Sequence, residues 1–274
     1  MFKNEAKHMS TQIISTQLKS CPQIKYLYHK PSNKNINRII VLVHGISRNA
    51  NEIINKFSKH DSVIEKGDLL IAPIFSKEFA TDYQRLGRMG KGPRTDYLLM
   101  SIINEVSENL DLQPALPLYL FGFSAGAQFA HRFAFAHPNR VKKLALVSAG
   151  WYTFPDKNTS YPLGLKLHNE FNDIEFQLER ILRIKCKVFI GEHDTKRKKG
   201  FNKNSQIDAQ QGENRKIRAH RWVSQMNQNS QKLDINNKIS LQILDNVDHD
   251  FIECDKKAQL IEKIYHWFNQ ARES

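Results

Sequence analysis

A serine between two glycines, at the junction of a strand and a helix, constrains this chain more than any other feature. Residues 117–123 form an uncharged, mostly apolar run, which is typical of a buried strand. Residues 125–137 are rich in Ala and Phe and stop at a proline, which favours a buried helix. Ser124 therefore lies on a sharp turn, where Gly122 and Gly126 avoid collisions between side chains and neighbouring backbone.

Similar apolar runs recur along the chain and alternate with helical patterns. Seven strands are predicted, at 24–29 (an edge-strand candidate), 38–44, 68–75, 117–123, 142–148, 186–190 and 239–244. Helices are predicted at 51–66, 96–108, 125–137 and 256–272, and an amphipathic one, weakened by Gly212, at 208–226 with Ile217 and Trp222 inward. This alternation indicates an α/β fold with right-handed crossovers and a mostly parallel sheet.

The domain organisation follows from length and from two interruptions of this pattern. The 274 residues, with no internal repeat and no low-complexity linker, predict a single domain over 1–274. Residues 151–182 and 195–238 break the alternation and are interpreted as cap-like insertions, not separate domains. We expect them over the C-terminal edge of the sheet, where doubly wound folds bind ligands.

A nucleophilic serine needs a base, a group that orients the base, and donors for the developing oxyanion. On a strand–serine–helix turn the acid and then a histidine follow the serine in the chain. Asp194 is the predicted acid because it follows an apolar strand, and Glu192 is the near alternative. His249 is the predicted base, since it alone among 11 histidines has both this order and a place after the last strand.

Two backbone N–H groups are predicted to bind the oxyanion. One belongs to Ala125, directly after the serine, and the other to the loop that follows an early strand, with the sequence VHGISRN. Gly45 permits a tight turn there, so Ile46 is the predicted second donor, with Ser47 as the alternative. We expect His44 to hold this loop by hydrogen bonds rather than to take part in the chemistry.

The substrate side is indicated by aromatic and basic residues in the two insertions. Three aromatic residues after the fifth predicted strand either line an acyl pocket or pack the insertion onto the core: Trp151, Tyr152 and Phe154. Three arginines beside the predicted acid either face an anionic substrate group or lie on a solvated helix: Arg197, Arg215 and Arg218. Arg197 is the one included in the predicted pocket.

Net charge bears on which molecules the protein binds, and cysteine content bears on its cellular compartment. The net charge is +13, concentrated at 195–203 and 215–221, yet the sequence has no nucleic-acid-binding motif and no apolar run long enough to span a membrane. The three scattered cysteines predict neither a disulfide framework nor a zinc site, and favour a reducing compartment. With no secretory signal evident, a cytoplasmic protein without a metal or organic cofactor is expected.

These residues together give a resemblance to α/β-hydrolase fold proteins over about 24–272, carried by His44-Gly45, the GFSAG run at 122–126, Asp194 and His249. More narrowly, the chain resembles bacterial esterases related to polyhydroxybutyrate depolymerases, through the stretches YQRLG at 83–87, 122–138, GWYTFP at 150–155 and QGENRKIRAHRW at 211–222. The resemblance implies a sheet of about eight strands, helices on both faces, a Ser–His–Asp triad and acyl-transfer hydrolysis. The lack of a secretion signal departs from extracellular depolymerases and argues against an external polymer as substrate.

The expected function is that of a carboxylesterase-like serine hydrolase acting on a small-molecule ester, with thioester or amide cleavage as close variants. Two alternatives come from other classes. One is a hydrolase-fold protein that binds polyanions through 195–221 without catalysis, and the other is a transferase or peroxidase that uses the same serine. The sequence does not specify acyl length or oligomeric state, nor whether 195–221 is a lid.

Overall fold

The computed structural model describes residues 12–31, 35–61, 63, 67–87, 91–113, 116–168, 171–198 and 200–270. This part of the chain contains a sheet of eight strands in the order β1-β2-β4-β3-β5-β6-β7-β8. The strands are β1 (Ile13–Leu18), β2 (Cys21–His29), β3 (Arg38–Val43), β4 (Asp68–Ile74), β5 (Leu118–Phe123), β6 (Val141–Val147), β7 (Cys186–Gly191) and β8 (Ser240–Leu244). β2 pairs antiparallel with β1 and β4, and all other neighbours are parallel, so the mostly parallel sheet is confirmed.

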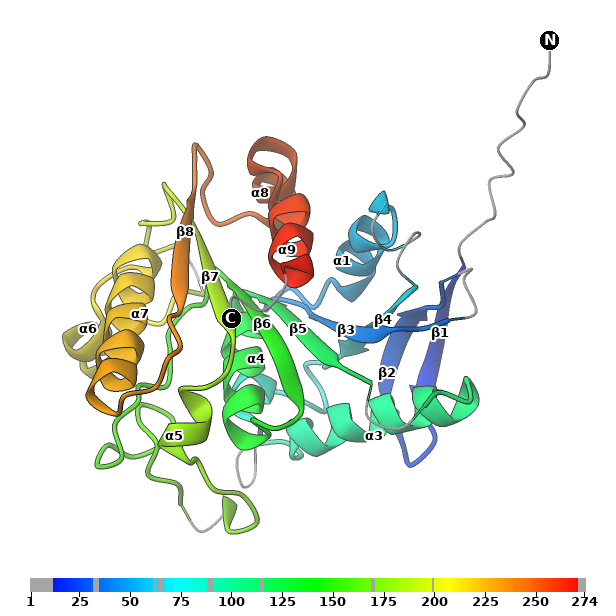
Figure 1. Ribbon diagram of the computed structural model, residues 1–274, viewed down its shortest axis with the longest axis horizontal. Coiled ribbons are helices and arrows are strands. Elements are labelled where there is room, and N and C mark those ends of the chain that lie inside the picture. The colour runs from blue at the N-terminus through cyan, green and yellow to red at the C-terminus, as the bar shows by residue number, and fades with distance from the viewer. Residues whose placement is uncertain are drawn as a thin grey trace.

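Helices cover both faces of the sheet (Figure 1). On one face lie α1 (Ala50–Phe57), α8 (Phe251–Ala258) and α9 (Leu260–Asn269). On the other lie α3 (Thr95–Asn109), α4 (Ala125–Ala136), the short α5 (Leu178–Ile181) and α7 (Arg215–Lys232), with α6 (Ser205–Gln211) beside α7. Each face has its own hydrophobic core, and β3 shows why its sequence is continuously apolar: Ile40 and Leu42 enter one core, whereas Ile39 and Val41 enter the other.

The seven predicted strands are all present, but the prediction of an edge strand at 24–29 is wrong. That segment lies within β2, which has a partner on each side, and β1 forms the edge instead. β1 escaped detection because it reads IISTQL, a short mixed run in which only Leu18 is fully buried. An antiparallel edge strand needs few buried positions, so its periodicity is weak.

Two of the predicted helices are each divided into two shorter helices in the structure. The helix predicted at 256–272 is two helices, α8 and α9, separated at Gln259, whose φ is 51°. α8 begins at Phe251 because the Asp250 side chain accepts a hydrogen bond from the Glu253 N–H at 2.9 Å. Residues 271–272 of that prediction lie outside the described residues. The helix predicted at 51–66 corresponds to α1, which ends at Phe57, and residues 62 and 64–66 of that prediction also lie outside the described residues.

The helix predicted at 208–226 is likewise divided. Gly212 has a φ of 105° and separates α6 from α7, which begins anew after Asn214. The Asn214 side chain accepts a hydrogen bond from the Ile217 N–H at 3.0 Å. The prediction that Ile217 faces inward is wrong, since Ile217 lies in the first turn of α7 after this break and is 39% exposed, whereas Trp222 is buried as predicted.

No helix among the described residues is both long enough and apolar enough to cross a membrane.

Candidate active site

Ser124 occupies the turn between β5 and α4 in a strained conformation, with φ 56° and ψ −113°. Its N–H donates to the Val147 carbonyl at 2.8 Å, which fixes the turn to β6. A Cβ at Gly122 would lie 2.3 Å from the Gly126 carbonyl oxygen, and a Cβ at Gly126 would lie 2.2 Å from that of Val43. Both glycines are therefore required by close backbone approach, which explains the spacing of the motif.

His249 connects Ser124 to Asp194. Its Nε2 lies 3.0 Å from the Ser124 Oγ, and its Nδ1 lies 2.8 Å from Asp194 Oδ2. A carboxylate only accepts hydrogen bonds, so Nδ1 carries the proton in the neutral ring, and Nε2 is left to accept from the serine hydroxyl. The Phe123 ring stacks on the imidazole, with centroids 5.1 Å apart. Three side chains from three separate loops thus form one hydrogen-bonded chain.

The alternative acid, Glu192, has a different partner. Its Oε2 accepts a hydrogen bond from the Asn246 N–H at 3.0 Å. This contact joins the loop after β7 to the loop after β8. Between the two candidates, only the Asp194 carboxylate contacts His249.

Asp248 and Asp250, which flank His249, have roles in shaping its loop. Asp248 Oδ1 accepts a hydrogen bond from the His249 N–H at 2.8 Å, and Asp250 caps α8. Lys198 and Lys196 lie 2.8 and 3.3 Å from Asp248 Oδ2. Despite partial burial, hydrogen bonds from Lys198 and the His249 N–H lower the pKa of Asp248 to about 2, so the carboxylate is ionised at neutral pH.

The loop after β3 lies directly against the serine. A Cβ built on Gly45 would be 3.5 Å from the Ser124 Cβ. Within the described residues, neither the Ile46 N–H nor the Ala125 N–H has a hydrogen-bond acceptor. Ile46 and Ala125 both line a cavity that Ser124 also borders, so the two predicted donors lie near the serine. Ser47, the alternative donor, lines only the second of the cavities described below.

His44 holds this loop, as predicted. Its Nδ1 lies 2.9 Å from the Gly45 carbonyl oxygen, and its Nε2 accepts from the Phe75 N–H at 3.0 Å. The Tyr83 hydroxyl donates to the His44 carbonyl at 2.9 Å. Burial lowers the pKa of His44 to about 4, so the ring is neutral and uses both nitrogens to fix the loop.

The neutral His44 gives the first testable prediction, a loss of stability in weak acid. An unfolded histidine has a pKa of about 6.5, so stability is complete above that pH and falls as the pH drops towards about 4, by on the order of 3 kcal/mol for this residue. Burial also lowers the pKa of His29 and His131, which adds to the effect. Urea unfolding at pH 7 and at pH 4.5 measures the difference.

The contribution of His44 is isolated by substitution. His44→Gln should reduce the loss of unfolding free energy between the two pH values, whereas the exposed control His220→Gln should leave it unchanged. An equal pH dependence in wild type and both variants would show that His44 is not held neutral.

Ser124, His249 and Ile46 border two cavities. The first, of about 240 Å³, is called the Arg215 cavity and is also lined by Gln84, Ala125, Gln128, Gly150, Trp151, Gly200, Phe201, Asn202 and Arg215. The second, of about 290 Å³, is called the Glu52 cavity and is also lined by Gly45, Ser47, Asn49, Glu52, Ile53, Phe123, Asp250, Phe251 and Ile252. A substrate held at Ser124 can therefore extend in two directions.

Of the predicted pocket residues, Trp151 lines the Arg215 cavity and the other three lie elsewhere. Tyr152 points into the core and stacks on Trp222, with centroids 4.7 Å apart. Phe154 borders a separate cavity near Arg221. Arg197 is paired with Asp208 at 2.7 Å. Side chains of neighbouring residues in an extended segment point in opposite directions, which is consistent with Trp151 facing the cavity and Tyr152 facing the core.

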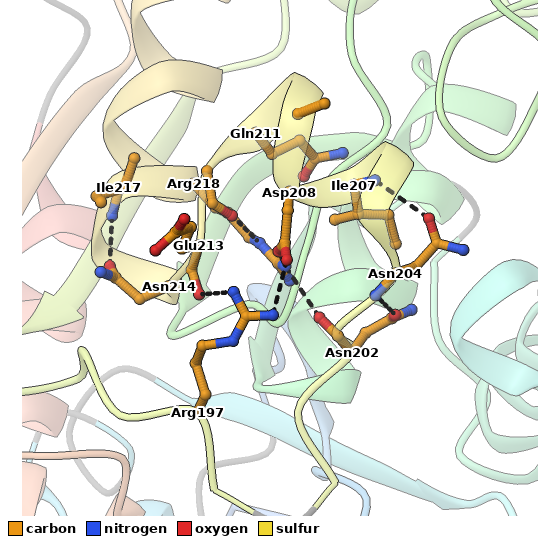
Figure 2. A network of polar contacts seen from close by, with 12 residues as sticks. Arg197, Asn202, Asn204, Ile207, Asp208, Gln211, Glu213, Asn214, Ile217 and Arg218 are labelled. Atoms are coloured by element: carbon orange, nitrogen blue, oxygen red, sulfur yellow. Dashed lines mark hydrogen bonds and ion pairs between the residues drawn. The ribbon is translucent and has the colours of Figure 1, made fainter.

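The basic segment 195–221 is tied together by Asp208 (Figure 2). Asp208 lies 2.7 Å from Arg197 Nη2 through one oxygen and 2.7 Å from Arg218 Nη2 through the other. The fully buried Arg218 also donates to the carbonyls of Gly150 and Asn202, at 2.6 and 2.9 Å. These contacts fix the loop that carries Phe201 against the site, so this part of the insertion forms a wall of the Arg215 cavity.

Sequence reasoning missed that Arg215 contacts the predicted acid. Arg215 Nη1 donates to Asp194 Oδ1 at 3.1 Å, opposite the oxygen that faces His249. The arginine stands at the start of α7, and nothing in its local sequence indicates a partner 21 residues earlier. Gln128, one turn after the serine on α4, and Phe201 also line the cavity without having been predicted.

Comparison with known proteins shows which fold this is. No protein-family model matches the sequence, and no curated protein sequence matches it. Among solved structures, it is similar to LpqC, a poly(3-hydroxybutyrate) depolymerase from Bordetella parapertussis, with a TM-score of 0.75, 20% identity, and coverage of 96% of this chain and 92% of that one. Poly(aspartic acid) hydrolase-1 from Sphingomonas sp. KT-1 gives a TM-score of 0.74 at 20% identity, covering 94% and 97%.

An S-formylglutathione hydrolase from Agrobacterium tumefaciens is also similar, with a TM-score of 0.61 at 12% identity and coverage of 93% and 92%. The strand order, the helices on both faces and these structures agree, and the chain has the α/β-hydrolase fold.

Proposed function

We propose that this protein is a serine hydrolase that cleaves a carboxylic ester through an acyl-enzyme, with Ser124 as nucleophile, His249 as base and Asp194 as the orienting carboxylate. The observation that carries the proposal is the hydrogen-bonded chain from Ser124 Oγ to His249, at 3.0 Å, and from His249 to Asp194, at 2.8 Å. The strained turn that presents the serine supports it, as do the Ile46 and Ala125 N–H groups, which have no acceptor in the described part of the chain.

The proposed reaction uses each of these groups in turn. His249 Nε2 takes the proton as Ser124 Oγ attacks the carbonyl carbon, and the Ile46 and Ala125 N–H groups stabilise the oxyanion. The imidazolium, stabilised by Asp194, gives that proton to the leaving alcohol, which leaves an acyl-serine. His249 then takes a proton from water, the hydroxide attacks the acyl-serine, and the proton returns to Ser124 as the acid departs.

The similar proteins are named for different substrates: a poly(3-hydroxybutyrate) depolymerase, a poly(aspartic acid) hydrolase and an S-formylglutathione hydrolase. The fold alone does not choose among such acyl-transfer reactions, and we propose ester cleavage as the reaction class. Thioester and amide cleavage are its close variants. We further propose a small-molecule substrate and a cytoplasmic location, which the three unpaired cysteines support.

Turnover of p-nitrophenyl acetate and butyrate tests the proposal, with added alcohol or peroxide to detect acyl transfer to other acceptors. We expect release of p-nitrophenol and of free acid with water as the acceptor. Products formed only with alcohol or peroxide would instead indicate the transferase or peroxidase alternative. Absence of turnover together with salt-sensitive binding of polyanions would favour the non-catalytic alternative.

The two acidic candidates give a matched pair of variants. Asp194→Asn should lower kcat by about 10³- to 10⁴-fold, because an amide there no longer stabilises the imidazolium or fixes the tautomer. Glu192→Gln makes the same chemical change two residues away and should leave kcat within about twofold, since the Glu192 carboxylate contacts the Asn246 N–H and His193 rather than His249. Equal losses in the two variants would exclude Asp194 as the specific partner of His249.

A further inference from the structure

The two cavities at Ser124 differ in charge. The Glu52 cavity has two carboxylate residues in its wall, Glu52 and Asp250. The Arg215 cavity has an arginine and three amide side chains in its wall, Gln84, Gln128 and Asn202, and no acidic residue among its lining residues. An anionic part of a substrate is therefore repelled from one cavity and attracted to the other.

Arg215 is only partly satisfied by the protein. It is 7% exposed, and its Nη1 donates to Asp194. Its Cζ lies 4.9 Å from the centroid of the Phe201 ring, and within the described residues neither its buried Nε nor its Nη2 has a hydrogen-bond partner. The Nε and Nη2 atoms form one edge of a guanidinium, and Arg38 shows how this edge binds a carboxylate: its Nε and Nη2 each lie 2.7 Å from one oxygen of Asp68. The corresponding edge of Arg215 lacks such a carboxylate.

Gln128 is a second unsatisfied polar side chain in the same wall. It is 8% exposed, its Oε1 is buried without a partner, and its amide nitrogen has no acceptor within the described residues. The amide N–H₂ group can donate to an acceptor that a ligand supplies, whereas the buried Oε1 would need a donor and gains nothing from a carboxylate. Gln128 and Arg215 together offer N–H donors to whatever enters the cavity.

A fully buried arginine behind this wall adds positive charge. Arg132 lies against Trp151, with its Cζ 4.2 Å from the ring centroid. It donates to the Gln84 carbonyl at 2.5 Å and to the Thr153 hydroxyl at 2.9 Å, both neutral oxygens, and its Nη2 has no partner among the residues that the structure describes. Burial lowers the pKa of Arg132 to about 10, so the guanidinium remains charged at neutral pH.

We propose that the substrate is an ester carrying a carboxylate, and that this carboxylate enters the Arg215 cavity, where Arg215 and Gln128 bind it. The inference rests on the proposed function and specifies the substrate class of that site. Arg215 and Ser124 line the same cavity, and Asp194 and His249 stand between them in the hydrogen-bonded chain, so we place the carboxylate several carbon atoms from the scissile carbonyl.

The test compares each acid with its isosteric neutral amide. Monomethyl adipate against methyl adipamate places the charge on the acyl side, and 6-acetoxyhexanoate against 6-acetoxyhexanamide places it on the alcohol side. We expect kcat/KM to be at least about tenfold higher for the acid in one of the two pairs, the size expected for one charge-assisted contact. A ratio near one in both pairs would overturn the inference.

Variants locate the preference. Arg215→Gln should bring the acid-to-amide ratio close to one, and Gln128→Met should lower it several-fold. Arg215→Lys, which keeps the charge, should retain part of the ratio. Arg221→Gln, an equal loss of charge on the exposed side of α7, is the matched control and should leave the ratio unchanged. A ratio that survives Arg215→Gln would contradict the assignment. The ratio isolates the carboxylate contact because any effect of Arg215 on Asp194 acts on both esters.

Binding separates this inference from the proposed function. Calorimetry with the Ser124→Ala protein should give a Kd for the favoured acid at least about tenfold lower than for its amide. Equal affinities would overturn the carboxylate assignment even if wild type hydrolyses neutral esters. Preferential binding of the acid without any turnover by wild type would support the anion site and count against the hydrolase.

Discussion

Ser124→Ala should lower kcat/KM for short esters by about 10⁴- to 10⁶-fold, which is the range seen when a serine nucleophile is removed. The hydroxyl is the atom that attacks, and its hydrogen bond within the described structure is to His249 Nε2. The Ser124→Ala protein keeps the proposed oxyanion donors and both cavities, so weak catalysis above the uncatalysed rate should persist. Steady-state kinetics on purified wild type and variant measure the loss.

Ser148→Ala is the matched control for this variant. Ser148 follows β6 much as Ser124 follows β5, it also has a positive φ of 50°, and its buried hydroxyl has no hydrogen-bond partner in the portion of the chain that is described. We expect full ester turnover from it, and unchanged thermal unfolding for both variants. A Ser124→Ala protein that keeps more than about one tenth of wild-type turnover would contradict the role of Ser124.

Gly122→Ala should strongly destabilise the protein. A Cβ there would lie 2.3 Å from the Gly126 carbonyl oxygen and 2.6 Å from the Ala127 nitrogen. Both are backbone atoms, so β5 and α4 would have to separate beside the strained serine, which costs at least about 3 kcal/mol. Urea unfolding measures the change, and a large drop in yield of folded protein is the other expected sign.

Gly45→Ala is the matched control, because its Cβ would meet its nearest neighbours at 3.4 and 3.5 Å, an ordinary contact distance. Its unfolding free energy should change by less than about 1 kcal/mol. Equal stability of wild type and Gly122→Ala would mean that the turn is less tightly packed than described.

The sequence predicts the central strands and the serine turn well because their signals are local. β3 is continuously apolar since both of its faces are buried, and the glycines around Ser124 record a close approach between adjacent elements. Order along the chain together with a position just after a strand predicted Asp194, with Glu192 as the near alternative, and His249. The structure brings Asp194 and His249 together.

What the sequence does not reveal depends on contacts between distant residues. Arg215 meets Asp194 across 21 residues, and Gln128 faces the cavity only because α4 is seated on a particular turn. The helix breaks at Gly212 and Gln259 depend on left-handed or extended-glycine backbone conformations that tertiary packing selects. Trp151 and Tyr152 are adjacent in the chain, and the core position of Tyr152 includes its stacking on Trp222, 70 residues away in the sequence, which no local pattern indicates.

A fluorophosphonate probe followed by peptide mass spectrometry tests the central claim most directly. An activated serine attacks the phosphorus and displaces fluoride, so the expected result is one adduct, on Ser124, that is absent from Ser124→Ala and greatly slowed in His249→Ala. Ser148→Ala should be labelled as wild type is. No adduct on wild type, or an adduct on another residue, would contradict the assignment of Ser124 as the nucleophile.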